Sequence, residues 1–127
     1  SLAVAKLFKS KVISVDNDEN ALEVTKKNIQ KNSLSSFVKV SQAEGFKGYS
    51  LNSKGRYDLI LANILYRPIK YLLLDFYKNL EPRGYLILSG LNKKQAKDIR
   101  NSCLHFNFRL VRHMSDCNWT GLLLRKG

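Results

Sequence analysis

The sequence holds few of the residues on which several common classes of site depend. Its 127 residues include only two cysteines and two histidines. A zinc site would need all of Cys103, Cys117, His105 and His113 at an unusual spacing, so two ordinary thiols in a reducing compartment are favoured. No Ser-His-Asp or Cys-His arrangement is evident. No apolar run approaches the roughly 18 residues that cross a bilayer, and no signal peptide is indicated. We therefore expect a cytoplasmic protein that makes no contact with a membrane.

Acidic residues are scarce as well. Ten Asp and Glu stand against 22 Lys and Arg, which gives a net charge of +12 and favours contact with polyanions without identifying one. The lysines are spread over most segments, and no aromatic residues interleave with them as a base-stacking surface would require. A solvated surface is favoured over a dedicated nucleic-acid groove. We expect no direct sequence-specific contact with nucleic acid, while proximity to a ribosome stays open.

The length and the 44% hydrophobic content suit one domain with a real core, residues 1–127, and are too small for two. Apolar and alternating runs predict strands, the first of them continuous and typical of a strand buried on both faces. These strands are 12–15, 37–40, 57–62, 85–89 and, as an antiparallel pair joined by the loop HMSDCN, 106–112 and 119–125. Helical spacing predicts helices at 2–8 and 66–80. A third helix is predicted to begin after the Asp18 cap and to end at the segment NSLSS. A fourth begins at a capping box of Asn92 and Gln95 and continues to about Cys103.

Strand and helix alternate along the chain before the closing hairpin. This order predicts an α/β fold with a mostly parallel sheet, covered by helices on both faces and closed by an antiparallel C-terminal element. Ligands of such sheets bind at the carboxyl ends of the strands. The residues at those ends are Asp16 and Asn17, Ser41 to Ala43, Asn63 to Leu65, and Ser89 to Leu91.

Asp16 lies where a nucleotide-binding α/β domain places the acid that binds a ribose. A carboxylate suits that task because it offers two acceptors to the neighbouring hydroxyls. The alternative is that Asp16 begins the cap of the next helix, but Asp18 can fill that role, so the ribose role is favoured. The glycine-rich loop that precedes such an acid is absent from this sequence.

Asn63, in the segment ANIL, lies at the carboxyl end of another predicted strand. Its side chain offers both a donor and an acceptor, and the neighbouring backbone carbonyl adds a second acceptor. Such a pair could hold an amine nucleophile in line with an electrophilic carbon. An asparagine that simply caps the helix of Tyr66 to Leu80 is an equally good interpretation of the residues alone.

Several segments together resemble a known family. They are VISVDNDENAL, then YDLILANIL followed by a helix, LEPRGYLILSGL, KQAKDIR and the final NWTGLLLRK. They are similar to the catalytic domain of the PrmA family, the bacterial ribosomal protein L-eleven methyltransferases, over essentially the whole chain. ANIL, GYLILSGL and the terminal strand that contains tryptophan are the most specific of these segments.

The resemblance implies a Rossmann-like class I methyltransferase fold that uses S-adenosylmethionine. The implied acceptors are amino groups, both lysine side chains and an N-terminal amine, of a large-subunit ribosomal protein. Asp16 with Asn17 matches the acidic turn that binds the cofactor ribose, and Asn63 matches the asparagine of the cofactor and substrate site, the one catalytic position carried over. Gln42 and Ala43 match the loop beside the adenine, which is a weaker correspondence.

The sequence also departs from the family pattern. The family's first strand and glycine-rich loop would lie before Ser1, which suggests an N-terminally truncated domain with its first strand missing. That strand is central in this class, so its absence is expected to leave unpaired strand edges within the sheet. We expect the chain alone to be weakly active or inactive, and tight adenosylmethionine binding measured by calorimetry would contradict this.

Two alternatives remain beside the leading interpretation. The acceptor could be a nucleic-acid base or a glutamine amide, although relatives with those substrates more often carry an NPPY-like turn where this chain has NILY. The chain could also be a degenerate, non-catalytic relic. The retained Asp16 and Asn63 favour catalytic ancestry, whereas the missing loop argues against present activity.

Overall fold

The computed structural model describes residues 1–47 and 56–127. The chain divides into two compact units, Ser1–Lys54 and Gly55–Gly127. Each unit has a β-sheet of its own. Both combine helices with β-strands, as the α/β prediction requires.

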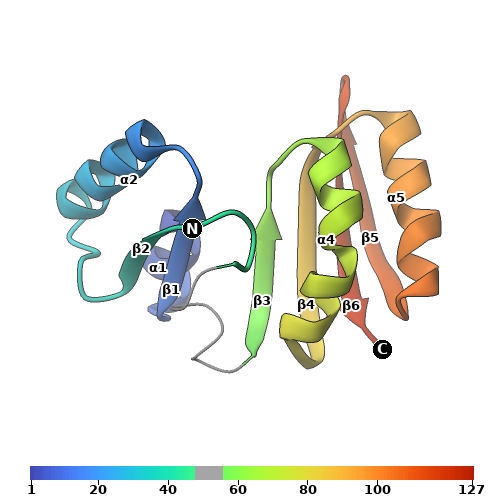
Figure 1. The fold of residues 1–127 in the computed structure, drawn as a ribbon, viewed down its shortest axis with the longest axis horizontal. Coiled ribbons are helices and arrows are strands. Elements are labelled where there is room, and N and C mark those ends of the chain that lie inside the picture. Colours follow the sequence, from blue (N-terminus) through green and yellow to red (C-terminus); the bar gives the residue numbers. More distant parts are fainter. Residues whose placement is uncertain (48–55) are drawn as a thin grey trace. The chain divides into compact units, whose positions relative to one another are not determined.

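The first unit is built on a parallel strand pair. Its elements are α1 (Leu2–Phe8), β1 (Val12–Asp16), α2 (Glu19–Lys31) and β2 (Val38–Gln42) (Figure 1). The strands pair in register from Val12 opposite Val38 to Asp16 opposite Gln42. A small core joins α1, α2 and β2 through the buried side chains of Ala5, Ile29, Leu34 and Val38.

The second unit is a mixed sheet that carries two helices. Its elements are β3 (Tyr57–Ala62), α4 (Tyr66–Asn79), β4 (Leu80–Leu91), α5 (Lys93–His105), β5 (Phe108–Asp116) and β6 (Trp119–Lys126). The strand order is β3-β4-β6-β5, with β3 parallel to β4 and both other pairs antiparallel. Helices α4 and α5 lie side by side against this sheet (Figure 1). The parallel pairs and the antiparallel C-terminal element confirm the predicted fold class.

The core of the second unit follows the alternation of its strands. Leu86 and Leu88 of β4, and Leu122 and Leu124 of β6, are at most 1% exposed. Between them, Ile87 and Leu123 point to the other side of the sheet and are half-buried. Burial of one side chain in two is the pattern expected of strands with a single well-covered face.

Several predicted boundaries need correction. The fourth strand begins at Leu80, not Tyr85, because Leu80 already pairs with Tyr57 of β3. The fifth begins at Phe108 and continues to Asp116, which pairs with Trp119, so most of the predicted HMSDCN loop belongs to the strand.

The first predicted strand is also less buried than its apolar sequence suggested. Val12, Ile13, Ser14 and Val15 are all half-buried. In the described part of the first unit, β1 has β2 as its only strand partner. One edge of β1 is therefore unpaired there, and a two-stranded sheet gives its residues little cover.

The two cysteines lie in different surroundings. Cys103 on α5 is buried, and burial raises the pKa of its thiol to about 12. Cys117, in the turn between β5 and β6, is exposed. Among the described residues, no group of three or more His, Cys, Asp or Glu side chains is arranged to hold a metal ion. None of the helices in that part of the chain has the length and apolar character needed to span a membrane.

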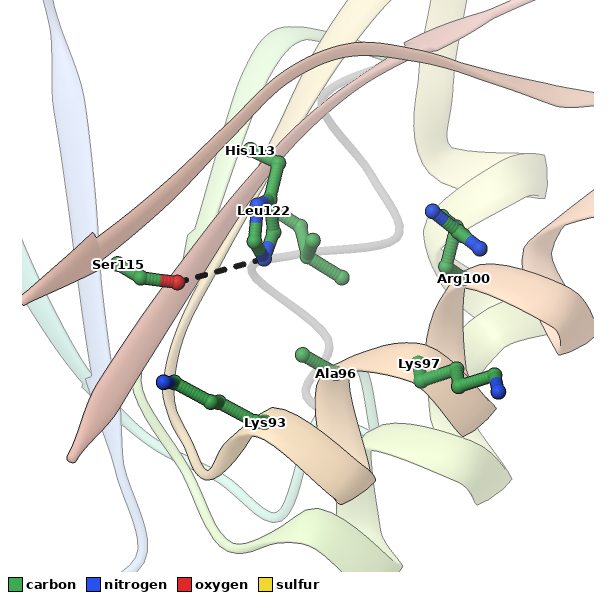
Figure 2. A pocket seen from close by; sticks show the side chains of 7 residues that line it. All are labelled: Lys93, Ala96, Lys97, Arg100, His113, Ser115 and Leu122. Atoms are coloured by element: carbon green, nitrogen blue, oxygen red, sulfur yellow. Dashed lines mark hydrogen bonds between the residues drawn. The ribbon is translucent and has the colours of Figure 1, made fainter.

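The second unit also contains a pocket. Side chains of α5, β5 and β6 line an open pocket of about 410 Å³ (Figure 2). It lies on the helix-bearing side of the sheet, because it is lined by Leu122, whose side chain belongs to the buried face.

Candidate functional site

The carboxyl ends of β1 and β2 bring the predicted residues of the first unit together. Asp16 pairs with Gln42 across the strands, and the backbone N–H of Ala43 donates to the carbonyl oxygen of Asp16 at 3.1 Å. The side-chain amide of Gln42 donates to the carbonyl oxygen of Asn17 at 3.5 Å. The side chains of Asp16, Asn17 and Gln42 are exposed. The structure therefore forms one polar edge from residues that lie 25 positions apart.

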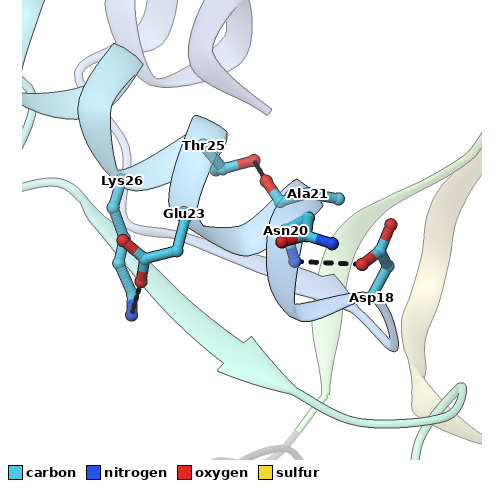
Figure 3. Close-up of polar contacts among 6 residues, drawn as sticks. All are labelled: Asp18, Asn20, Ala21, Glu23, Thr25 and Lys26. Carbon is cyan, nitrogen blue, oxygen red and sulfur yellow. Dashed lines mark hydrogen bonds and ion pairs between the residues drawn. The ribbon is translucent and has the colours of Figure 1, made fainter.

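Asp16 and Asp18 make different hydrogen bonds in the acidic turn. The Asp18 side chain accepts a hydrogen bond from the backbone N–H of Asn20 at 2.9 Å and caps α2, as predicted (Figure 3). One Asp16 carboxylate oxygen accepts from the backbone N–H of Asp18 at 3.0 Å and so shapes the turn. The other Asp16 oxygen accepts no hydrogen bond from any residue that the structure describes. Asp16 therefore supports the turn and still offers an acceptor to a ligand.

The first turns of α2 carry further local contacts. Lys26 pairs with Glu23 at 2.9 Å, and this hydrogen bond, aided by the lysine charge, lowers the pKa of the Glu23 carboxyl (Figure 3). The Thr25 hydroxyl donates to the carbonyl of Ala21. These contacts stay within the helix and leave the polar edge at Asp16 free.

Asn63 does not cap the helix that comes after it. The N-cap of α4 is Leu65, and no side chain bonds to the helix end there. The capping interpretation of Asn63 is therefore wrong. Its side chain is exposed and makes no hydrogen bond with a described residue, so both its donor and its acceptor are available.

Gly90 makes room for the Asn63 side chain. A Cβ atom added at Gly90 would lie 2.5 Å from the Asn63 Oδ1 atom, far inside contact distance. Gly90 also has a φ of +77°, a left-handed conformation that favours glycine. Gly90 falls within the predicted row of strand ends, but nothing in the sequence linked it to Asn63. The available signal was a glycine that follows the apolar run of a strand after one intervening residue, Ser89.

A charged cluster fixes the first turn of α4 against α5. The Tyr66 hydroxyl donates to a carboxylate oxygen of Asp98, and Lys70 Nζ lies 2.9 Å from the same oxygen. These hydrogen bonds lower the pKa of the Asp98 carboxyl and raise the pKa values of the Tyr66 hydroxyl and the Lys70 ammonium. Because Tyr66 comes directly after the ANIL segment, this cluster restrains the chain just beyond Asn63. Sequence reasoning missed it.

Comparison with known proteins identifies the family. The family model described as "Ribosomal protein L11 methyltransferase (PrmA)" matches residues 1–127. The chain belongs to this family.

Curated proteins with the same name align along nearly the whole chain. The ribosomal protein L11 methyltransferase of Rhodopseudomonas palustris is 32% identical over 126 residues, which cover 99% of this chain and 43% of that protein. The protein of that name from Rhizobium rhizogenes is 34% identical over 124 residues, which cover 98% of this chain and 42% of that protein. The chain thus spans less than half the length of these PrmA relatives.

Solved structures agree on the fold. A ribosomal protein L11 methylase from Lactobacillus delbrueckii subsp. bulgaricus superposes with a TM-score of 0.85 at 24% identity, covering 99% of this chain and 64% of that one. A methyltransferase from Pyrococcus furiosus superposes with a TM-score of 0.79 at 22% identity, and the match covers 98% of this chain and 66% of that one. The Rossmann-like methyltransferase fold predicted from the PrmA resemblance is confirmed.

Proposed function

We propose that this chain forms the catalytic part of an S-adenosylmethionine-dependent methyltransferase of the cytoplasm. Its acceptors are amino groups of a large-subunit ribosomal protein, both lysine side chains and an N-terminal amine. Membership of the PrmA family supports the reaction class. The structural observation that carries the proposal is the Asp16 carboxylate, which keeps one oxygen free of described partners at the carboxyl end of β1.

The residues at this edge suit the polar parts of the cofactor. Asp16 would accept hydrogen bonds from the ribose hydroxyls, because a carboxylate accepts from two neighbouring donors. Asn17, Gln42 and Ala43 would border the ribose and the adenine. The Gln42 amide keeps acceptor capacity beyond its contact with the Asn17 carbonyl. When bound, S-adenosylmethionine supplies an electrophilic methyl group on a sulfonium centre.

Asn63 would position the acceptor amine. Its side-chain oxygen and a neighbouring backbone carbonyl can each accept an N–H bond, which leaves the nitrogen lone pair directed elsewhere. Two acceptors can hold a neutral amine in one orientation, and orientation is a major source of rate enhancement. A lysine must lose its proton before it can attack, and contact with an apolar surface favours the neutral form. The exposed Ile64 and Leu65 beside Asn63 offer such a surface.

We also propose that both compact units belong to one catalytic domain, residues 1–127. The uninterrupted match of the family model supports this assignment.

The ribose role of Asp16 can be tested with two matched substitutions in the same turn. Asp16→Asn and Asp18→Asn each remove one negative charge, and each retains a side-chain oxygen for its backbone hydrogen bond. We expect Asp16→Asn to weaken S-adenosylmethionine binding by about 10- to 100-fold, the value of a charged hydrogen bond. Asp18→Asn should change the affinity by less than about twofold, because asparagine is an equally good N-cap.

The measurement is a titration followed by NMR, which also detects weak binding. S-adenosylmethionine should shift the backbone amide signals of Asp16, Asn17 and Ala43 in the unmodified chain. Equal weakening by both substitutions would show that only the overall charge of the turn matters. Absence of any shift at millimolar ligand would reject the proposed function and favour the relic interpretation.

A further inference from the structure

The pocket in the second unit is lined by positive side chains from one helix face. Lys93, Lys97 and Arg100 succeed each other at spacings of four and three along α5, which places them on the same face of the helix. Figure 2 shows the three side chains on α5 with their charged ends pointing in different directions, Lys93 toward the side of Ser115 and Lys97 away from it, while His113 and Ser115 come from β5. Two separate elements thus contribute polar groups to one pocket of about 410 Å³.

In the described parts of the chain, no carboxylate neutralises these cations. Within the residues that the structure describes, Lys93, Lys97 and Arg100 form no ion pair. The one acid on α5 is Asp98, and Tyr66 and Lys70 of α4 already bind it. The pocket therefore keeps its positive charge, and an anion entering it need displace no internal partner.

Further hydrogen-bonding groups complete the opposite wall. The Ser115 hydroxyl lies 3.5 Å from the His113 Nε2 atom and 3.2 Å from the Thr120 hydroxyl. A hydroxyl can donate to an anion while it accepts from its neighbour. Cations on one side and a hydroxyl on the other suit a phosphate group, whose oxygens accept hydrogen bonds from several directions.

The other residues that line the pocket indicate which part of a nucleic acid it would contact, the phosphate backbone or a base. Ala96 and Leu122 supply the apolar part, and no Phe, Tyr or Trp lines the pocket. Base recognition by single-strand binders depends on stacking against aromatic side chains, whereas contacts to the phosphate backbone need only positive charge and hydrogen-bond donors. The exposed Lys94 adds a further positive charge on α5.

We propose that this pocket binds phosphate groups of an RNA backbone, independently of base sequence. The site lies wholly in the second unit, and the inference does not depend on methyl transfer. It would give a ribosomal-protein methyltransferase a contact with an RNA-rich particle. It also assigns part of the net charge of +12 to a defined place on the surface.

The test uses a fluorescently labelled single-stranded RNA and the 127-residue chain, with binding followed by anisotropy at several salt concentrations. The variant Lys93→Gln, Lys97→Gln, Arg100→Gln should bind at least about tenfold more weakly. Its salt dependence should lose about two units of slope, since each phosphate contact in a single strand contributes about 0.7. Inorganic phosphate should compete only at concentrations far above those of the RNA.

A matched control removes the same charge elsewhere. Lys27, Lys31 and Lys39 are exposed in the first unit, and changing all three to Gln should lower the affinity less and leave the slope nearly unchanged. Equal losses of RNA affinity in both triple variants would contradict the proposed binding site, because overall charge would then explain the binding. Phosphate that binds as tightly as RNA would overturn the RNA assignment. Circular dichroism checks that each variant folds. If the triple variant fails to fold, the single variants Arg100→Gln and Ser115→Ala replace it, and each is expected to weaken RNA binding.

Discussion

Replacing Lys126 with methionine is expected to lower the free energy of unfolding by about 3–6 kcal/mol, since two charged hydrogen bonds are lost. The Lys126 side chain is only 8% exposed, yet it has no acidic partner among the described residues. Its ammonium donates to the backbone carbonyls of Tyr77 at 2.7 Å and Leu80 at 2.9 Å. Methionine would fill much of the same volume but leave both carbonyls without this donor, and each lost charged hydrogen bond costs about 1.5–3 kcal/mol.

The position of these carbonyls explains why a buried charge is stabilising there. Helix α4 ends at Asn79, so the Tyr77 carbonyl belongs to its last turn, beyond which the helix supplies no further donor. The helix dipole places partial negative charge at this end, which favours a cation. The Tyr77 ring lies 4.2 Å from the Lys126 ammonium and adds a cation–π contact. A residue of the last strand therefore stabilises the junction of α4 and β4.

The matched control is Lys78→Met. Lys78 carries the same charge in the same last turn but is exposed, so its substitution should change the unfolding free energy by less than about 0.5 kcal/mol. Urea denaturation followed by far-ultraviolet circular dichroism measures both variants. Similar destabilisation by the two substitutions would mean that net charge, rather than the buried hydrogen bonds, accounts for the effect.

Local signals explain which parts of the fold could be predicted. The capping box of Asn92 and Gln95 forms with both hydrogen bonds, at 2.8 and 3.0 Å, because its geometry depends on residues only three apart. The Asp18 cap is equally local. The strand from Tyr57 to Ala62 has the predicted bounds. Such elements need no knowledge of their neighbours.

Boundaries set by pairing could not be predicted in this way. Leu80 joins β4 because Tyr57 lies opposite it, 23 positions earlier in the chain, and Ser115 and Asp116 join β5 because Thr120 and Trp119 continue the ladder. Between Leu80 and Tyr85 the register with β3 shifts, and Arg83 has a φ of 65°, so the strand is irregular there. The contact of Lys126 with Tyr77 likewise spans 49 positions, and no periodicity indicates it.

The candidate site shows the same division. The approach of Asp16 to Gln42 results from strand order, since the carboxyl ends of neighbouring parallel strands meet at one edge. The bond between Tyr66 and Asp98 depends on how two helices rotate against each other. Sequence spacing within either helix does not determine that rotation.

Replacing Gly90 with alanine is expected to displace the Asn63 side chain and to destabilise the fold by about 2 kcal/mol. About 1–2 kcal/mol arises from holding a non-glycine residue in the left-handed region. The added Cβ would also approach the Asn63 Oδ1 atom to 2.5 Å, so the amide must rotate away. Under the proposed function, a displacement of about 1 Å would slow methyl transfer by about 100-fold.

Two further variants separate the backbone effect from the side-chain clash. Gly121→Ala is the control, because its Cβ would meet its nearest neighbour, the Leu88 carbonyl oxygen, at an ordinary 3.6 Å. It should cost less than about 1 kcal/mol. In the double variant Asn63→Ala, Gly90→Ala, the clash is gone and only the backbone cost should remain. The two substitutions should therefore be coupled by about 0.5–1 kcal/mol in urea denaturation.

NMR of the Asn63 side-chain amide measures the displacement directly. Its signals should move in Gly90→Ala and stay in place in Gly121→Ala. Additive energies together with unmoved amide signals would show that Gly90 does not control Asn63. The expected result assigns Gly90 a positioning role. Gly90 contacts no ligand, but the absence of a side chain there leaves space for the Asn63 amide, which would hold the amine.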